Sequence, residues 1–149
     1  MSKKKIEWEY LFLIIISVIL LIVRINGKQK EYNIIKLLNT IYEVDSAKIY
    51  FPKQQKYIPL SEDSVHNLTN IQLLSSTQKR IIKKHSGCNE LFQILCYKDN
   101  DVLLTLTAID VDELKNEVEH MEFKNHKFVL MYNNVIFITK DITSTSAGG

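Results

Sequence analysis

The side chains most typical of zinc sites and of thiolate chemistry are few in this chain of 149 residues. They are four histidines and two cysteines: His66, His85, His120, His126, Cys88 and Cys96. A structural zinc site normally uses two ligand pairs separated by a longer stretch of chain, and His85 with Cys88 has no such second pair. A thiolate–imidazole dyad of the same two residues would lack an oxyanion-binding motif. We therefore expect no catalytic residue, no metal site and no cofactor.

The cysteines Cys88 and Cys96 allow two interpretations. In an oxidising compartment they could form a disulfide that closes a short loop. Alternatively, Cys96 shares one face of an expected strand with Phe92 and Ile94 and is a small buried hydrophobic residue. We favour the second interpretation on the basis of this alternation.

The densest cluster of charge consists of Lys79, Arg80, Lys83 and Lys84. Two functional roles fit it: contact with anionic lipid headgroups, or contact with an acidic partner protein. The commonest role of such a run is a solvated face, here around the apolar pair Ile81-Ile82. Nucleic-acid binding is not expected, because the net charge is only +2 and no aromatic side chain interleaves with the basic residues.

The segment Leu11–Val23 (LFLIIISVILLIV) is apolar at all but one position. It is shorter than the ~20 residues that cross a bilayer as a helix, but its flanks extend it. Trp8 and Tyr10 suit one membrane interface, and Arg24 can extend its side chain to the other. The sequence therefore predicts an N-terminal transmembrane anchor within residues 1–27.

A cleaved signal peptide and a buried core helix fit the apolar segment less well. A signal peptide would also begin with basic residues, but Arg24-Ile25-Asn26-Gly27 stands where small residues would mark the cleavage site. A buried core helix would not be expected to carry charges close to both of its ends. Positive charges lie on both sides of the anchor, so they orient it weakly. We favour a single-pass protein of the plasma membrane whose domain lies outside the cytoplasm.

Residues 28–142 alternate between helical and hairpin signals. The spacing of apolar residues at Glu31–Tyr42 predicts a helix after a break at Asn26-Gly27. It would either lie on the membrane surface or, as we favour, form the first core helix. Ser61 is expected to cap a helix with a buried face that extends to Leu74. Asp110 has capping-box spacing with Glu113 and predicts a helix through residue 121. Residues 77–87 fit either a helix or a strand.

Three hairpins are expected. The first joins residues 47–51 to 56–60, and Pro59, which has no amide hydrogen, predicts an edge strand. The second joins 91–97 to 102–108. The third joins 127–132 to 135–140 through Asn133-Asn134, a pair that suits a type I′ turn. In that hairpin Phe128 is expected on one face and Val129 on the other.

Alternating helices and hairpins predict the α+β class, with helices packed on one face of an antiparallel sheet. The expected organisation is an anchor at 1–27, a small domain at 28–142 and a disordered tail at 143–149, where the residues are small and polar.

Three stretches carry a resemblance to a group of proteins: AKIYF (Ala47–Phe51), NIQLLSST (Asn70–Thr77) and FQILCYKDNDVLLTL (Phe92–Leu106). Their layout is similar to that of uncharacterised small membrane-anchored or lipoprotein-like domains of Gram-positive bacteria. The resemblance covers about two-thirds of the chain and implies no catalytic residue. The helix expected at Val111–Met121 departs from that layout.

These observations lead to three functional hypotheses. The first is a membrane-anchored, non-enzymatic interaction module, for example an envelope accessory or an immunity-type protein, with the bilayer and a protein as its partners. The second is a regulator facing the cytoplasm that uses the basic cluster on lipid or on an acidic partner. The third is an unrecognised enzyme. No small-molecule substrate can be inferred from the residue patterns.

Overall fold

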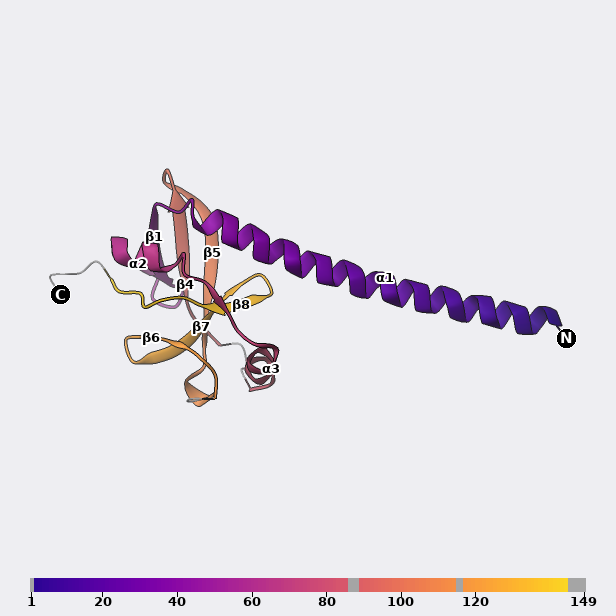
Figure 1. The fold of residues 1–149 in the computed structure, drawn as a ribbon. Coiled ribbons are helices and arrows are strands. Elements are labelled where there is room, and N and C mark those ends of the chain that lie inside the picture. The colour runs from indigo at the N-terminus through magenta and orange to yellow at the C-terminus, as the bar shows by residue number, and fades with distance from the viewer. Residues whose placement is uncertain (1, 86–88, 115–116, 145–149) are drawn as a thin grey trace.

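The computed structural model describes residues 2–85, 89–114 and 117–144. It contains one long helix that projects from a domain built on a single antiparallel sheet (Figure 1). The helices are α1 (Ser2–Ile41), α2 (Glu62–Asn67) and α3 (Ser76–His85), with a 3₁₀ turn at Asp112–Leu114. The strands are β1 (Ser46–Phe51), β2 (Lys56–Pro59), β3 (Gln72–Leu73), β4 (Glu90–Lys98), β5 (Asp101–Asp110), β6 (Met121–Phe123), β7 (His126–Tyr132) and β8 (Val135–Ile138). The predicted α+β class is confirmed.

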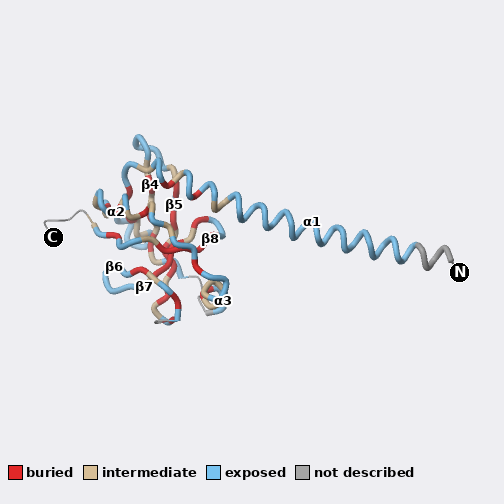
Figure 2. Tube along the Cα trace, in the orientation of Figure 1, coloured by how far each residue is buried: buried red, intermediate tan, exposed pale blue. Residues whose placement is uncertain are grey.

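Helix α1 is continuous, so the break expected at Asn26-Gly27 does not occur. A single glycine costs a helix only about 1 kcal/mol, and helical residues on both sides carry the hydrogen bonding through it. Within the described residues, one segment is long and apolar enough to cross a membrane, Glu7–Ile41. None of its most apolar stretch is buried in the protein, as Figure 2 shows. The apolar segment is therefore not part of the core of the domain.

The C-terminal end of α1 does belong to the domain. Leu37 and Ile41 are buried, and α1 contacts β5 and β8. The side chain of Asn33 donates a hydrogen bond of 3.0 Å to the side-chain oxygen of Asn134, in the turn between β7 and β8. The core helix expected at 31–42 is thus confirmed, as the last turns of the same helix that carries the apolar segment.

The sheet has the strand order β2-β1-β4-β5-β7-β8-β3, and β6 pairs with β7 outside this path. Strand β2 lies at an edge, as its proline predicts. The inward face of β4 is Phe92, Ile94 and Cys96, all buried as expected. Strand β7 differs from its predicted alternation, because Phe128 and Val129 are both fully buried. This strand lies inside the sheet and is covered on both of its faces.

One expected helix is shorter than predicted. Helix α2 has Ser61 as its N-cap, as expected, but it ends at Asn67 rather than near Leu74. The chain then forms β3, which pairs with β8. Leu68 and Leu74 are buried nonetheless. The apolar spacing therefore identified the buried residues, but pairing with a distant strand decided their conformation.

The prediction of a helix at Val111–Met121 is wrong. Asp110 ends β5, and its carboxylate accepts a hydrogen bond of 2.9 Å from the amide of Asp112 within a local turn. Only the short 3₁₀ turn follows, and Met121 begins strand β6, which pairs with β7. Aspartate often competes for backbone amides in this way and so favours turns over helices.

The turn at Asn133-Asn134 differs from the predicted type. Asn133 has a φ of 53°, whereas Asn134 does not have a positive φ. One positive φ at the first position is the pattern of a type II′ turn rather than the expected type I′ turn. Two more turns have positive φ at both positions, Asp99-Asn100 (51° and 70°) and Lys124-Asn125 (50° and 68°), and these fit type I′.

The remaining ambiguities are resolved as follows. The segment 77–87 is helical to His85 in the described residues, as part of α3.

Thr143 and Ser144 were expected in a disordered tail, but Ser64 donates from its hydroxyl to the carbonyl of Thr143 at 3.0 Å, and Ser144 pairs with Leu60. Ordered contacts with the domain therefore extend two residues beyond the expected boundary at 142. Residues 145–149 lie outside the described part of the chain.

Candidate functional site

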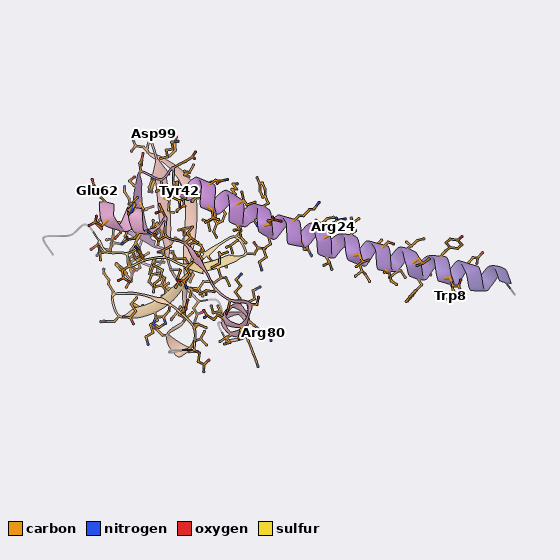
Figure 3. The ribbon with its side chains drawn as sticks, in the orientation of Figure 1. Trp8, Arg24, Tyr42, Glu62, Arg80 and Asp99 are labelled. Atoms are coloured by element: carbon orange, nitrogen blue, oxygen red, sulfur yellow. The ribbon has the colours of Figure 1, made fainter. Side chains whose placement is uncertain are left out.

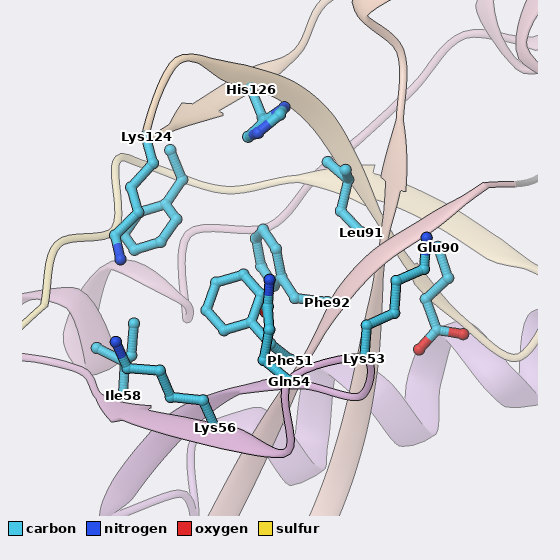
Figure 4. A pocket seen from close by; sticks show the side chains of 11 residues that line it. Phe51, Lys53, Gln54, Lys56, Ile58, Glu90, Leu91, Phe92, Lys124 and His126 are labelled. Atoms are coloured by element: carbon cyan, nitrogen blue, oxygen red, sulfur yellow. The ribbon is translucent and has the colours of Figure 1, made fainter.

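A cleft of about 540 Å³ opens between three hairpin ends of the domain (Figure 4). One wall is the end of the β1–β2 hairpin, the second is the start of β4, and the third is the β6–β7 turn. The lining residues are Phe51, Lys53, Gln54, Lys56, Ile58, Glu90, Leu91, Phe92, Phe123, Lys124 and His126. A volume of this size suits a small ligand or a few side chains of a partner.

The floor of the cleft is aromatic and rigid. Phe92 is 2 % exposed, and its ring lies 5.5 Å from that of Phe51 and 5.8 Å from that of Phe123. Behind it, the ring of Phe128 lies 5.0 Å away in an edge-on contact. Tilted and edge-on ring contacts of this kind are favourable beyond the area they bury. The floor is therefore an extension of the core that remains open to solvent on one side.

The rim carries mostly positive charge. Lys53, Lys56 and Lys124 are exposed, and none of them forms an ion pair with another described residue. The ammonium of Lys124 lies 5.7 Å from the ring centre of Phe51 and 5.6 Å from that of Phe123, so it sits above the floor. The one acidic lining residue is Glu90, which Figure 4 labels at the start of β4. The cleft therefore suits a negatively charged ligand.

The turn that carries Lys124 is held in place by Asp112. Its carboxylate accepts a hydrogen bond of 2.7 Å from the amide of Lys127, at the start of β7, and lies 3.3 Å from the ring nitrogen of His126. The backbone hydrogen bond, followed by the contact with His126, keeps the pKa of Asp112 below its ordinary value. Asp112 is thus a structural support for one wall of the cleft.

The basic cluster that the sequence singled out lies on α3, away from the cleft. Ile82 is buried beneath the helix, and Arg80, Lys83 and Lys84 are exposed, as the label of Arg80 in Figure 3 helps to locate. Lys79 is half-buried. Burial and then the nearby charge of Lys30, on α1, lower the pKa of Lys79 below its ordinary value. Lys30, a residue that the sequence places only beside the anchor, therefore belongs to the same positively charged region.

The proposed anchor residues lie on the part of α1 that projects from the domain. Trp8 is 71 % exposed and Tyr10 is 63 % exposed, and Arg24 is exposed further along the helix (Figure 3). From Trp8 to Arg24 the helix rises by about 24 Å. That length is about 6 Å less than the roughly 30 Å of a bilayer's hydrocarbon core, a difference that the long side chain of Arg24 can span.

The candidate metal and nucleophile residues are dispersed where the structure describes them. No group of three or more histidine, cysteine or acidic side chains lies close enough to hold a metal ion within the described residues. Cys96 is a free, fully buried thiol, and burial raises its pKa to about 12. Cys88, the second residue of the possible disulfide, falls outside the described residues.

The cleft was not among the sites expected from the sequence. Its floor and rim come from three segments that are far apart in the chain, and each contributes a few residues near a strand end. The only signal available in the sequence was an aromatic residue close to a lysine at two of these ends, Phe51 with Lys53 and Phe123 with Lys124. Such pairs are common on protein surfaces and would not have been decisive.

Comparisons with known proteins returned no matching protein-family model, no matching curated protein and no matching solved structure.

Proposed function

We propose that the protein is a single-pass, membrane-anchored binding module that is not an enzyme, and that its cleft holds an acidic, partly apolar segment of a partner protein. The observation that carries this proposal is the buried aromatic floor beneath three exposed lysines that lack ion pairs among the described residues. An apolar side chain of the partner would cover the floor, and a neighbouring carboxylate would pair with a lysine.

The anchor supplies the second half of the proposal. The exposed apolar part of α1 has the length, the aromatic residues Trp8 and Tyr10, and the basic residue Arg24 that suit a membrane-spanning helix. Because α1 continues without a break into the core at Leu37, the domain would be held at the membrane by a helix rather than by a flexible linker. We further propose that the membrane is the plasma membrane and that the domain lies outside the cytoplasm.

The side of the membrane can be tested with one introduced thiol. Lys53 lines the cleft and is exposed, so Lys53→Cys in a Cys88→Ser background should react with a membrane-impermeant maleimide in intact cells. The remaining thiol, Cys96, is buried and should not label. Labelling that appears only after the cells are lysed would place the domain in the cytoplasm and contradict the proposed side.

The binding role can be tested by site-specific photocrosslinking of the full chain in native membranes. A photoreactive residue in place of Gln54, which lines the cleft, should give a discrete adduct with a partner protein. Charge reversal at Lys56 and Lys124 together should abolish the adduct. Lys98→Glu is the matched control, because Lys98 is exposed on a hairpin turn and does not line the cleft.

Two results would contradict the binding proposal. One is an adduct of equal yield in the Lys56→Glu/Lys124→Glu variant and in the parent. The second is the absence of any adduct from Gln54 when the protein is present at its natural level in membranes from its own host.

A further inference from the structure

Lys79 and Lys83 lie one turn apart on α3, on the side of the domain toward which α1 projects (Figure 1). Lys30 lies on α1, and its charge contributes to lowering the pKa of Lys79. No described carboxylate forms an ion pair with any of these three lysines. Like charges repel, so holding them together without an anion between them is unfavourable. The arrangement is that of a site prepared for a negatively charged group.

We call Lys30, Lys79 and Lys83 the basic face. Its position relative to the proposed anchor is fixed by the geometry of α1. From Asn26, where the membrane-spanning part would end, the helix rises about 6 Å to Lys30 and about 10 Å to Asn33. Asn33 is hydrogen-bonded to Asn134, and Leu37 is buried in the core, so the domain cannot swing away from the helix without breaking these contacts. Figures 1 and 2 show α3 on the side of the domain toward the projecting part of α1.

These distances decide which anions the basic face would meet. At physiological ionic strength, charges interact over a screening length of about 8 Å. Lys30 lies within that distance of the level at which headgroups would surround α1, and its charge acts on Lys79 of α3. A soluble acidic protein would have to enter this narrow space, whereas lipid headgroups are present there permanently.

We propose that Lys30, Lys79 and Lys83 form a docking face that binds the phosphate groups of anionic lipids and holds the domain against the bilayer. The inference rests on the proposed membrane anchoring, but it does not depend on the cleft. Its consequence is an orientation: with α3 against the membrane, the domain has one preferred face toward the lipid instead of tumbling about the end of α1.

The test uses the full chain in nanodiscs. A fluorophore is attached at Thr77→Cys, an exposed position on α3, in a Cys88→Ser background, and the lipid includes a nitroxide-labelled headgroup as quencher. Quenching should be stronger in nanodiscs that contain phosphatidylglycerol than in phosphatidylcholine alone. Each Lys→Gln change at 30, 79 or 83 should lower the docked-to-undocked ratio by about fivefold, the effect of one basic residue at an anionic surface.

The matched control removes one exposed lysine from another part of the same domain. Lys98→Gln, at the end of β4, carries the same loss of one charge as each test variant and should quench like the parent. Circular dichroism in the near ultraviolet shows whether each variant is folded. If the variants at 30, 79 and 83 alter the folded signal, raising the salt concentration on the parent provides the same test, because it should reduce quenching without any substitution.

Four outcomes would overturn the proposal. Equal quenching in anionic and zwitterionic nanodiscs would show that no lipid charge is recognised. Loss of quenching on addition of millimolar inorganic phosphate would indicate a site for a free anion rather than for a membrane. Quenching that falls on addition of a polyglutamate peptide, but not of an equally charged salt, would favour an acidic protein. A chain that does not enter nanodiscs at all would contradict the anchoring itself, which separates that failure from failure of the docking face.

Discussion

The cleft and the basic face both present lysines without ion pairs among the described residues, but they support them differently. In the cleft, Lys124 lies over the aromatic rings of a floor that continues into the core. In the basic face, Lys79 lies on a single short helix, and the charges that act on it come from Lys30 and Lys83. The cleft thus combines apolar contact with charge, whereas the basic face has charge alone. Binding in the cleft should therefore depend on the shape of the ligand and change little with salt concentration. Binding to the basic face should weaken as the salt concentration rises and depend little on the shape of the ligand.

Among substitutions at the two surfaces, the largest change in stability is expected for the floor of the cleft. Phe92→Ala should lower the free energy of unfolding by about 3–5 kcal/mol, because it leaves a cavity among the surrounding phenylalanine rings. The measurement is chemical unfolding followed by near-ultraviolet circular dichroism, since the single tryptophan, Trp8, lies outside the domain. Phe92→Leu should cost less. A loss below about 1 kcal/mol for Phe92→Ala would mean that the floor is not continuous with the core.

The next largest change in stability is expected for Asp112, which supports one wall of the cleft, and it depends on pH. The folded state holds the pKa of Asp112 below its ordinary value, so the unfolded chain takes up the proton first as the pH falls. The contribution of Asp112 is therefore complete above the unfolded pKa and is lost as the pH falls through the lower, folded value. Asp112→Asn should lower the free energy of unfolding by about 1 kcal/mol at neutral pH. The value is small for a hydrogen bond to a charged group, because the side chain is 39 % exposed and solvent screens its charge.

The same unfolding measurement, repeated from neutral pH down to acid pH, checks this sign. The stabilities of the parent and of Asp112→Asn should begin to converge as the pH falls through about 4, the unfolded pKa, and should meet only below the lower pKa of the folded state. Asp141→Asn is the comparison, because Asp141 is an exposed aspartate that does not line the cleft. A difference between parent and Asp112→Asn that grows as the pH falls would contradict the mechanism.

Smaller effects should distinguish the turns beside the two surfaces. Asn125, next to the cleft, and Asn133, next to α1, both have positive φ, so glycine at either position should stabilise the domain by about 0.5–1 kcal/mol. Asn134→Gly should instead destabilise it, because Asn134 lacks a positive φ and its side chain accepts the hydrogen bond from Asn33. Thermal melts of the three variants test this order. Stabilisation by Asn134→Gly would instead support the type I′ turn that the sequence suggested.

The smallest effect is expected on the basic face. Lys79→Gln removes the repulsion from Lys30 and Lys83 and should raise the stability of the domain by at most a few tenths of a kcal/mol. The gain should disappear at high salt, because these charges are largely open to solvent. Lys84→Gln, at an exposed position of α3, should change nothing measurable at either salt concentration. A clear loss of stability for Lys79→Gln would mean that the lysine is held by an anion-like partner within the protein.

The sequence by itself determined the features that depend on neighbouring residues. An unbroken apolar run is recognisable without any structure, and Pro59 marks an edge strand because proline cannot donate a hydrogen bond to a neighbour. Ser61 caps α2 because a short hydroxyl side chain can reach the free amides of the first turn. The face of β4 that contains Phe92 followed from strict alternation.

Only the tertiary structure decided the rest, because the deciding partners are distant in the chain. Pairing with β8 and β7 turned residues 72–73 and Met121 from expected helix into strand. Packing of other elements against the sheet buries β7 on both faces, which a single alternating pattern does not reveal. The charge of Lys30 acts on Lys79, and Phe92 contacts Phe51 and Phe123, through the packing of separate elements. Local signals thus identify many of the buried residues, and long-range pairing and packing fix their conformation and the surfaces that they build.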